Sequence, residues 1–101
     1  MHSHGFVIAR DHPALPGHFP GNPVVPGAVL LDCVRQVVLD ASPGARIAVV
    51  RWVKFLIPVS PGQRFVADLQ ARGQDIRFQC RVGEVVVLRG ALVLARAGVG
   101  S

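Results

Sequence analysis

The sequence lacks tyrosine and contains only two cysteines and one tryptophan among its 101 residues. Cys33 and Cys80 show none of the paired spacings typical of zinc ligands, and the four histidines are irregularly spaced. We therefore predict buried free thiols rather than a disulfide, and neither a metal ion nor a cofactor. Free thiols are typical of a cytoplasmic protein, which is the location we expect.

Acidic residues are also scarce, with six against eleven lysines and arginines, so the net charge is +5. This balance favours an acidic partner, although a solvated surface alone would also account for most of the charges. The basic residues are spread along the sequence, without the aromatic neighbours that stack on bases. We therefore expect an acidic protein partner and no nucleic acid.

Long uninterrupted hydrophobic runs are absent, because arginines break the apolar stretches well before the roughly 18 residues that a membrane span needs. The first residues show no charged segment leading into an apolar one, so we expect no secretory signal and no membrane span. Half of the residues are nevertheless hydrophobic, and the mean hydropathy is +0.43. A domain of this size cannot bury so much apolar surface by itself, which predicts an oligomer.

The hydrophobic pattern predicts one α+β domain over residues 1–101. One helix is expected at 28–41, where the apolar residues cover most sides, as in a buried helix. Strands are expected at 4–10, 45–59, 64–72, 75–82 and 85–95. Short links between the last four strands favour an antiparallel meander. An antiparallel sheet wrapped around one central helix satisfies both patterns.

Asp32 is a carboxylate inside the apolar helix, and Gln36 lies one turn later, where it can hydrogen-bond to that carboxylate. Apolar surroundings raise the pKa of a carboxyl and make it a possible general acid. The alternative is that Asp32 belongs to an ordinary polar stripe that faces water and continues to Asp40. The pattern alone leaves both interpretations open.

The loop before the helix holds five of the eight prolines and also contains His18. A single loop histidine is ordinarily a surface or packing residue. Gly27 follows Pro26 at the start of the helix, where free N–H groups and the helix dipole stabilise an oxygen that gains negative charge. Gly27 could equally be a simple turn residue.

The stretch from His18 to Gln36, HFPGNPVVPGAVLLDCVRQ, resembles the active-site segment of the 3-hydroxyacyl-[acyl carrier protein] dehydratases of the hot dog fold. Their signature is His-Phe-Pro-Gly-x-Pro, then Pro-Gly, then an acid fourteen residues after the histidine, which here is Asp32. Gln36 also matches. The stretch VKFLIPVSPGQ at residues 53–63 is similar to a second family segment, and the resemblance extends over about residues 5–95.

The resemblance implies a hot dog fold and a dehydratase that needs no cofactor. It implies that His18 removes the C2 proton of a 3-hydroxyacyl thioester and that Asp32 protonates the departing hydroxyl group. The Gly27 N–H would polarise the thioester carbonyl, and Gln36 would orient Asp32. Phe19 and Pro26, which belong to the same motif, are expected at the substrate site.

The family also implies an acidic acyl carrier protein as partner and a site shared between two subunits, so we expect a homodimer or a larger oligomer. Many members have a few dozen residues before the first strand, whereas this chain begins almost at that strand. It therefore resembles the short dehydratases of fatty acid, polyene or pigment pathways. Thioesterases and non-catalytic acyl-binding partner subunits share the fold and remain alternatives.

Overall fold

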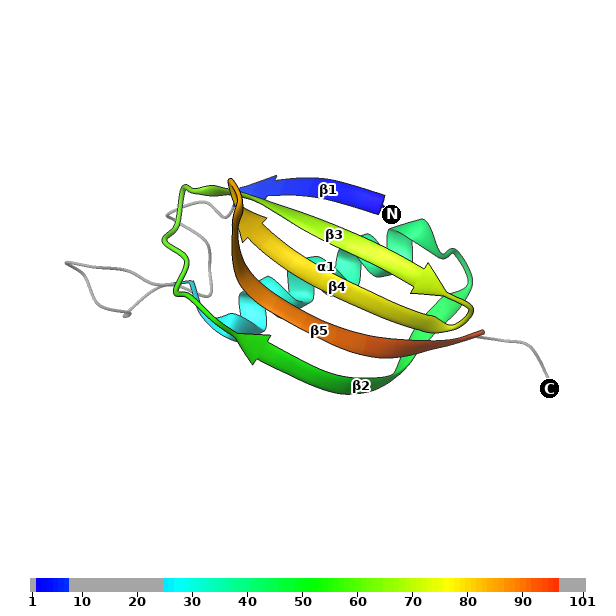
Figure 1. Ribbon diagram of the computed structural model, residues 1–101. Helices are drawn as coiled ribbons and strands as arrows, with labels where there is room; N and C mark the ends of the chain where they lie inside the picture. The colour runs from blue at the N-terminus through cyan, green and yellow to red at the C-terminus, as the bar shows by residue number, and fades with distance from the viewer. Residues whose placement is uncertain (1, 8–24, 97–101) are drawn as a thin grey trace.

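The computed structural model describes residues 2–7 and 25–96 as a five-stranded antiparallel sheet lying over one helix (Figure 1). The strands are β1 (His2–Val7), β2 (Ala45–Phe55), β3 (Arg64–Arg72), β4 (Asp75–Val82) and β5 (Val85–Arg96), and the helix is α1 (Gly27–Ala41). The strand order is β1-β3-β4-β5-β2. The predicted α+β class with a single helix is confirmed.

The helix α1 starts one residue before its predicted start and ends at the predicted residue, followed by Pro43 and by Gly44 with φ 80°. Its buried residues are Leu30, Val34, Val37 and Val38. This spacing places them on one side of the helix, toward the sheet, and leaves the opposite side exposed. The prediction that the helix is buried on most sides is therefore wrong for a single chain. The described part of the chain has no helix that is long and apolar enough to cross a membrane.

The hydrophobic core lies between α1 and the face of the sheet turned toward it, which we call the inner face. Residues opposite each other on this face include Ala67 and Cys80, and Cys80 and Leu88. All three have no exposed surface. Because side chains alternate along a strand, the residues between them point to the other side, the outer face. The predicted inward positions of β3 and β4 are confirmed.

Strands β3, β4 and β5 form the predicted meander through two tight turns. Gly73 and Gly83 open these turns with φ values of 62° and 60°, which glycine adopts without steric cost. Each turn contains two residues, so neighbouring strands pair along almost their whole length. The meander brings most of the core side chains together from a short stretch of sequence.

Strand β2 does not continue this meander, which corrects the prediction of four consecutively paired strands. It pairs with β5, so two strands separate it from β3. It also ends at Phe55 rather than at Val59, because the N–H groups of Leu56 and Ile57 both donate to the Val87 carbonyl, at 2.8 and 3.3 Å. Pro58 then removes a donor. The segment 56–63 therefore carries the chain across the sheet instead of turning back beside β2.

Candidate active site

The start of α1 is one side of the candidate site. Pro26 precedes the helix, and no side chain forms a capping hydrogen bond there. The Val29 N–H donates to the Pro26 carbonyl at 3.0 Å. The first backbone N–H groups of a helix have no partner inside it and carry the positive end of the helix dipole. This end of α1 can therefore stabilise an oxygen atom that gains negative charge.

The aromatic ring of Phe55 lies against Gly27. A Cβ atom at Gly27 would stand 2.6 Å from Cε1 of Phe55, closer than two such atoms can approach. A second contact joins the segment that follows β2 to the residue two positions before Gly27, because the Val25 N–H donates to the Val59 carbonyl at 2.7 Å. The two stretches that carry the family resemblance, residues 18–36 and 53–63, therefore meet at Val25 and Gly27 on one side and at Phe55 and Val59 on the other. The role of Phe55 was missed in the sequence, although the glycine at the helix start is a signal of close approach.

Asp32 lies on the side of α1 that faces away from the core. Its side chain is 64% exposed, and one carboxylate oxygen lies 3.6 Å from Nη1 of Arg35. The expectation of a carboxylate buried in an apolar helix is therefore wrong for the single chain. The reason is helix periodicity, because Asp32 lies midway in sequence between the buried residues Leu30 and Val34 and so projects to the opposite side.

Gln36 is exposed one turn after Asp32, as the spacing predicts. The hydrogen bond expected between the two side chains is not present among the described residues, where Arg35 contacts the carboxylate instead. The role of Gln36 in orienting Asp32 remains a prediction. Asp40 is exposed as well, which agrees with the alternative of a polar stripe along the helix.

A groove of about 420 Å³ opens beside Asp32, between α1 and β2. Its wall is apolar apart from Asp32 and Arg35, and the apolar lining residues are Ala28, Leu31, Val34, Ile47, Val50 and Leu92. An apolar groove with a carboxylate at its side suits a hydrocarbon chain that carries one reacting polar group. His18 and Phe19 lie outside the described residues.

The two cysteines are free, as predicted. Burial, and to a lesser degree the neighbouring Cys33 and Asp68, raise the pKa of the Cys80 thiol to about 12. Burial and the nearby Asp32 also raise the pKa of Cys33. Both thiols are therefore poor nucleophiles at neutral pH. Within residues 2–7 and 25–96, no cluster of three or more metal-ligating side chains occurs.

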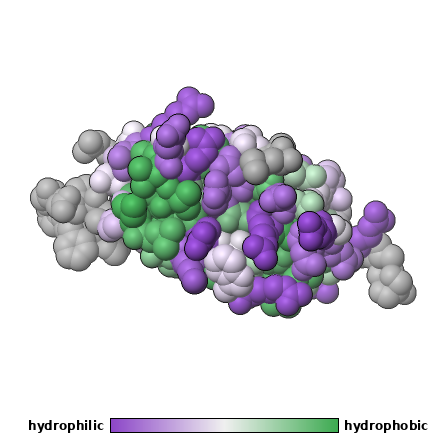
Figure 2. Space-filling view, viewed as in Figure 1, coloured by the Kyte–Doolittle hydropathy of each residue, from purple (hydrophilic) through white to green (hydrophobic). Residues whose placement is uncertain are grey.

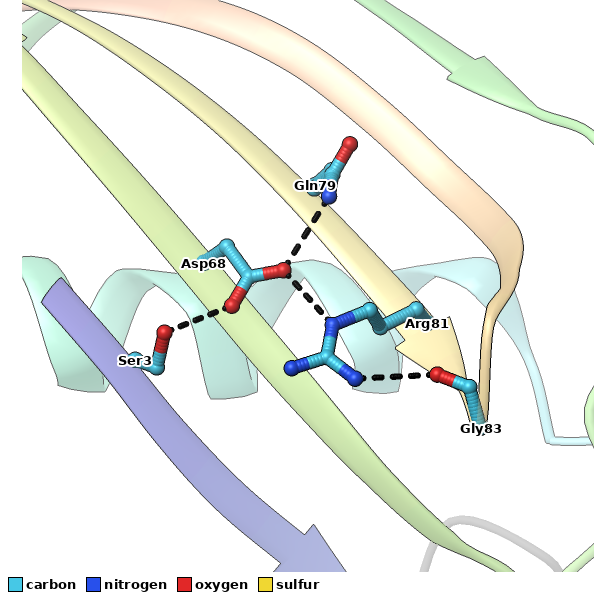
Figure 3. A network of polar contacts seen from close by, with 5 residues as sticks. All are labelled: Ser3, Asp68, Gln79, Arg81 and Gly83. Atoms are coloured by element: carbon cyan, nitrogen blue, oxygen red, sulfur yellow. Dashed lines mark hydrogen bonds and ion pairs between the residues drawn. The ribbon is translucent and has the colours of Figure 1, made fainter. Parts of the chain in front are cut away.

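A polar network that the sequence analysis missed lies on the outer face of the sheet (Figure 3). Asp68 is 5% exposed and accepts hydrogen bonds from Ser3 Oγ at 2.7 Å, Gln79 Nε2 at 3.1 Å and Arg81 Nε at 2.9 Å. Arg81 also donates to the Gly83 carbonyl at 2.9 Å. The only available sequence signal was that Asp68, Gln79 and Arg81 all occupy outward positions of paired strands.

Burial by itself raises the pKa of Asp68. The hydrogen bonds from Ser3, Gln79 and Arg81, together with the charge of Arg81, outweigh that effect and hold the pKa below its usual value. The carboxylate therefore remains charged and joins three strands, since Ser3 is on β1, Asp68 on β3 and the other two donors on β4. It is placed to stabilise the sheet rather than to transfer protons.

Comparison with known families agrees with this arrangement. The family model of the ApeI-like dehydratases, described as ApeI dehydratase, matches residues 2–90. The chain belongs to the ApeI-like dehydratase family. The match includes the helix with Asp32 and all strands but the end of β5.

Among the similar sequences of this ApeI-like chain is the 3-hydroxyacyl-[acyl-carrier-protein] dehydratase FabZ of Thermus thermophilus. The two are 34% identical over 89 residues, which are 79% of this chain and 60% of FabZ. The chain thus spans less than two thirds of the length of that relative.

Solved structures give the fold of the ApeI-like chain. The dehydratase heterocomplex ApeI:P from Xenorhabdus doucetiae matches with a TM-score of 0.82 at 22% identity, over 93% of this chain and 86% of that one. The fluoroacetyl-CoA thioesterase FlK matches with a TM-score of 0.61 at 19% identity, over 94% and 84%. The predicted hot dog fold is confirmed. At such identities the likeness shows the fold alone, which is common to dehydratases and thioesterases.

Proposed function

We propose that the chain eliminates water from a 3-hydroxyacyl thioester carried by an acyl carrier protein and forms a 2-enoyl thioester. The observation that carries the proposal is the position of Asp32 beside an apolar groove, five residues after the uncapped start of α1 at Gly27. Five helical residues span about 7.5 Å along the axis, a distance suited to one small reacting group. Membership of a dehydratase family and the FabZ relative support the same reaction.

In the proposed mechanism, His18 removes the proton at C2 of the substrate, and the electron pair moves toward the thioester carbonyl. The Gly27 N–H stabilises the negative charge that develops on this oxygen. The C3–oxygen bond then breaks while Asp32 donates a proton, so the hydroxyl group leaves as water. The base has gained one proton and the acid has lost one, and exchange with water restores both.

For Asp32 to act as an acid, the groove beside it should be shielded from water by a second copy of the chain. A carboxyl group can donate a proton at neutral pH only where its surroundings disfavour the charged form. Asp32 is 64% exposed in the single chain. Strand β2, which borders the groove, is the last strand at its edge of the sheet and exposes Val49, Val50 and Phe55. We therefore propose a dimer in which the β2 edges meet and the groove is closed.

The reaction is tested with a panel of 3-hydroxyacyl pantetheine thioesters, using mass spectrometry to detect the loss of water. We expect Asp32→Asn to slow dehydration by about a hundredfold or more, which is the usual scale for a lost acid–base group. Asp40→Asn is the matched control, because Asp40 is an exposed aspartate two turns further along the same helix, and it should retain full activity. Release of free thiol without loss of water would favour a thioesterase, and absence of both products would favour a binding subunit.

Exchange of the C2 hydrogen in heavy water separates the two catalytic roles. If His18 is the base, His18→Ala should lose both dehydration and C2 exchange. Asp32→Asn should lose dehydration but retain part of the exchange, because proton removal at C2 does not need the acid. Full dehydration by Asp32→Asn would show that the assignment of the acid is wrong.

The dimer is tested by light scattering of the wild type and of Val49→Lys, which places a charge on β2. Val85→Lys is a matched control, because both valines are 52% exposed but Val85 lies at the start of β5. We expect only Val49→Lys to weaken association.

If the site is shared, mixing His18→Ala chains with Asp32→Ala chains should restore part of the activity. A stable and active wild-type monomer would contradict the proposal.

A further inference from the structure

The outer face of the sheet gathers most of the chain's eleven lysines and arginines. The strand registers and the alternation of side chains, together with the ion pair of Arg51 with Asp75, place eight of them there. They are Arg46, Arg51, Lys54, Arg64, Arg72, Arg77, Arg81 and Arg89. We call these residues the arginine face. In Figure 2 hydrophilic side chains cover much of this side of the sheet, next to an apolar area at the left.

Within residues 2–7 and 25–96, only two carboxylates lie among these cations. Asp68 is buried and already binds Arg81 at 2.9 Å. Asp75 forms an exposed pair with Arg51 at 3.6 Å, and such pairs contribute little. The opposite side of the molecule differs, because the exposed side of α1 carries Asp32 and Asp40 with Arg35 alone. The positive charge of the part that the structure describes is therefore concentrated on one side.

The arginine face is not smooth. Two shallow hollows of about 220 and 570 Å³ lie side by side and share Trp52, Gln70 and Arg77 in their walls. Arg89 borders the smaller hollow, and Arg72 borders the larger one. Apolar atoms of Phe78 and Gly90 line the first hollow, and Ala91 and Leu92 line the second. The face thus offers two hollows of mixed polar and apolar lining, bordered by cations.

Trp52 stands between the hollows and is 38% exposed. The Lys54 Nζ atom lies 5.8 Å from the centre of its ring. Tryptophan and arginine are the residue types that contribute most to protein–protein interfaces. A single aromatic ring already accompanied by a lysine is a poor platform for stacked bases, which require several rings along a groove. These features favour a protein over a nucleic acid as occupant.

We propose that the arginine face docks the folded domain of an acidic acyl carrier protein. A second copy of this chain would bring like charges together, which disfavours self-association through this face. Leu92 lines both the larger hollow and the Asp32 groove, so a single layer of sheet separates the docking surface from the groove. The identity of the partner rests on the proposed function, whereas the position of the surface rests on the charges.

The test measures binding of the apo form of an acyl carrier protein, which has no prosthetic arm and so reports the surface alone. We expect the double variant Arg77→Glu/Arg89→Glu to weaken binding at least about tenfold, and wild-type binding to weaken as salt rises. Arg77→Lys/Arg89→Lys should keep most of the affinity, since it preserves the charge. Arg96→Glu is the matched control, because Arg96 is exposed on β5 but alternates toward the inner face.

Turnover of a pantetheine thioester is measured with the same variants, because this small substrate needs the groove but no docking surface. We expect unchanged pantetheine turnover together with lost carrier binding in Arg77→Glu/Arg89→Glu. Equal carrier binding by that variant and by Arg96→Glu would overturn the proposal even if dehydration is observed. Tighter binding of single-stranded DNA than of the carrier protein would overturn it too. If the wild type does not dehydrate the pantetheine thioester at all, the proposed function is contradicted instead.

Discussion

The inner and outer faces of the sheet use the same strands for different purposes. Along β4, Ile76, Phe78 and Cys80 point inward and are at most 5% exposed, whereas Arg77 between them is exposed. The inner face packs against α1 and therefore determines stability through apolar burial. The outer face carries charges that the core does not need. This difference indicates that the inner residues serve folding, while the exposed outer cations are available for binding.

The largest expected contrast between the faces is between two neighbours on β4. Phe78→Ala removes a ring that is 3% exposed, and we expect it to lower the free energy of unfolding by about 3–5 kcal/mol. Arg77→Ala should change it by no more than about 0.5 kcal/mol, because its side chain is exposed. Urea denaturation of both variants measures the difference. Equal losses would show that the outer face is also part of the core.

A smaller effect is expected at Gly90, where the inner face has no room for a side chain. A Cβ atom there would overlap the Phe78 ring and stand 2.6 Å from the Trp52 carbonyl oxygen. Because the backbone of β2 cannot move easily, Gly90→Ala should lower stability by about 1–3 kcal/mol. In the background of Phe78→Ala the cost should be smaller, since the ring is gone. A double-mutant cycle by thermal unfolding measures this coupling, and exact additivity would contradict the packing argument.

The buried carboxylate of Asp68 on the outer face should make the stability of the protein depend on pH. Asp68→Asn keeps the shape but loses charge-assisted hydrogen bonds, so we expect a loss of about 1–3 kcal/mol at neutral pH. The pKa of Asp68 is lowered in the folded state, so its contribution is present above the unfolded value of about 3.9 and is lost as pH falls below it. The stability gap between wild type and Asp68→Asn should therefore narrow in acid.

Asp75→Asn is the control for this measurement. Its carboxylate lies on the same face and contacts Arg51, but its side chain is 63% exposed. We expect at most about 1 kcal/mol from this pair at any pH. If the stability of Asp75→Asn depends on pH in the same way as that of Asp68→Asn, burial of Asp68 is not the cause of the pH dependence.

The smallest effect concerns the rates at which the two thiols react. Cys80 is fully buried on the inner face with a pKa of about 12, and Cys33 is half-buried on α1. In folded protein at about pH 8, we expect iodoacetamide to modify Cys33 slowly and to leave Cys80 unmodified until the chain unfolds. Peptide mass spectrometry after timed labelling distinguishes the two. Faster labelling of Cys80 would contradict its burial.

The sequence was sufficient for features that depend on local periodicity. The helix was placed to within one residue, and the alternation along β4 identified its inner face, because both patterns repeat over a few residues. The resemblance carried by residues 18–36 and 53–63 identified the family, and the structure brings Gly27 and Phe55 from these stretches together.

Features that depend on distant partners were not predictable in this way. The pairing of β2 with β5 joins segments about forty residues apart. The sequence of β2 itself does not indicate which strand it pairs with. The exposure of Asp32 follows from which helix side meets the sheet, and half-buried residues such as Leu31 and Cys33 made the helix appear apolar all around. Likewise, cations that are spread along the sequence became one surface only when the strands paired.

The crossing made by residues 56–63 has a consequence for the order in which the protein is assembled. β5 follows β2 in the chain with β3 and β4 between them, so β2 has no partner for its backbone until β5 has been synthesised. Unpaired apolar strands are prone to misassociation. We expect the β3–β5 meander to form first and β2 to join it later, because loop closure over a longer stretch is slower. Pulsed hydrogen exchange would show β4 amides protected before those of β2, and simultaneous protection would rule out this order.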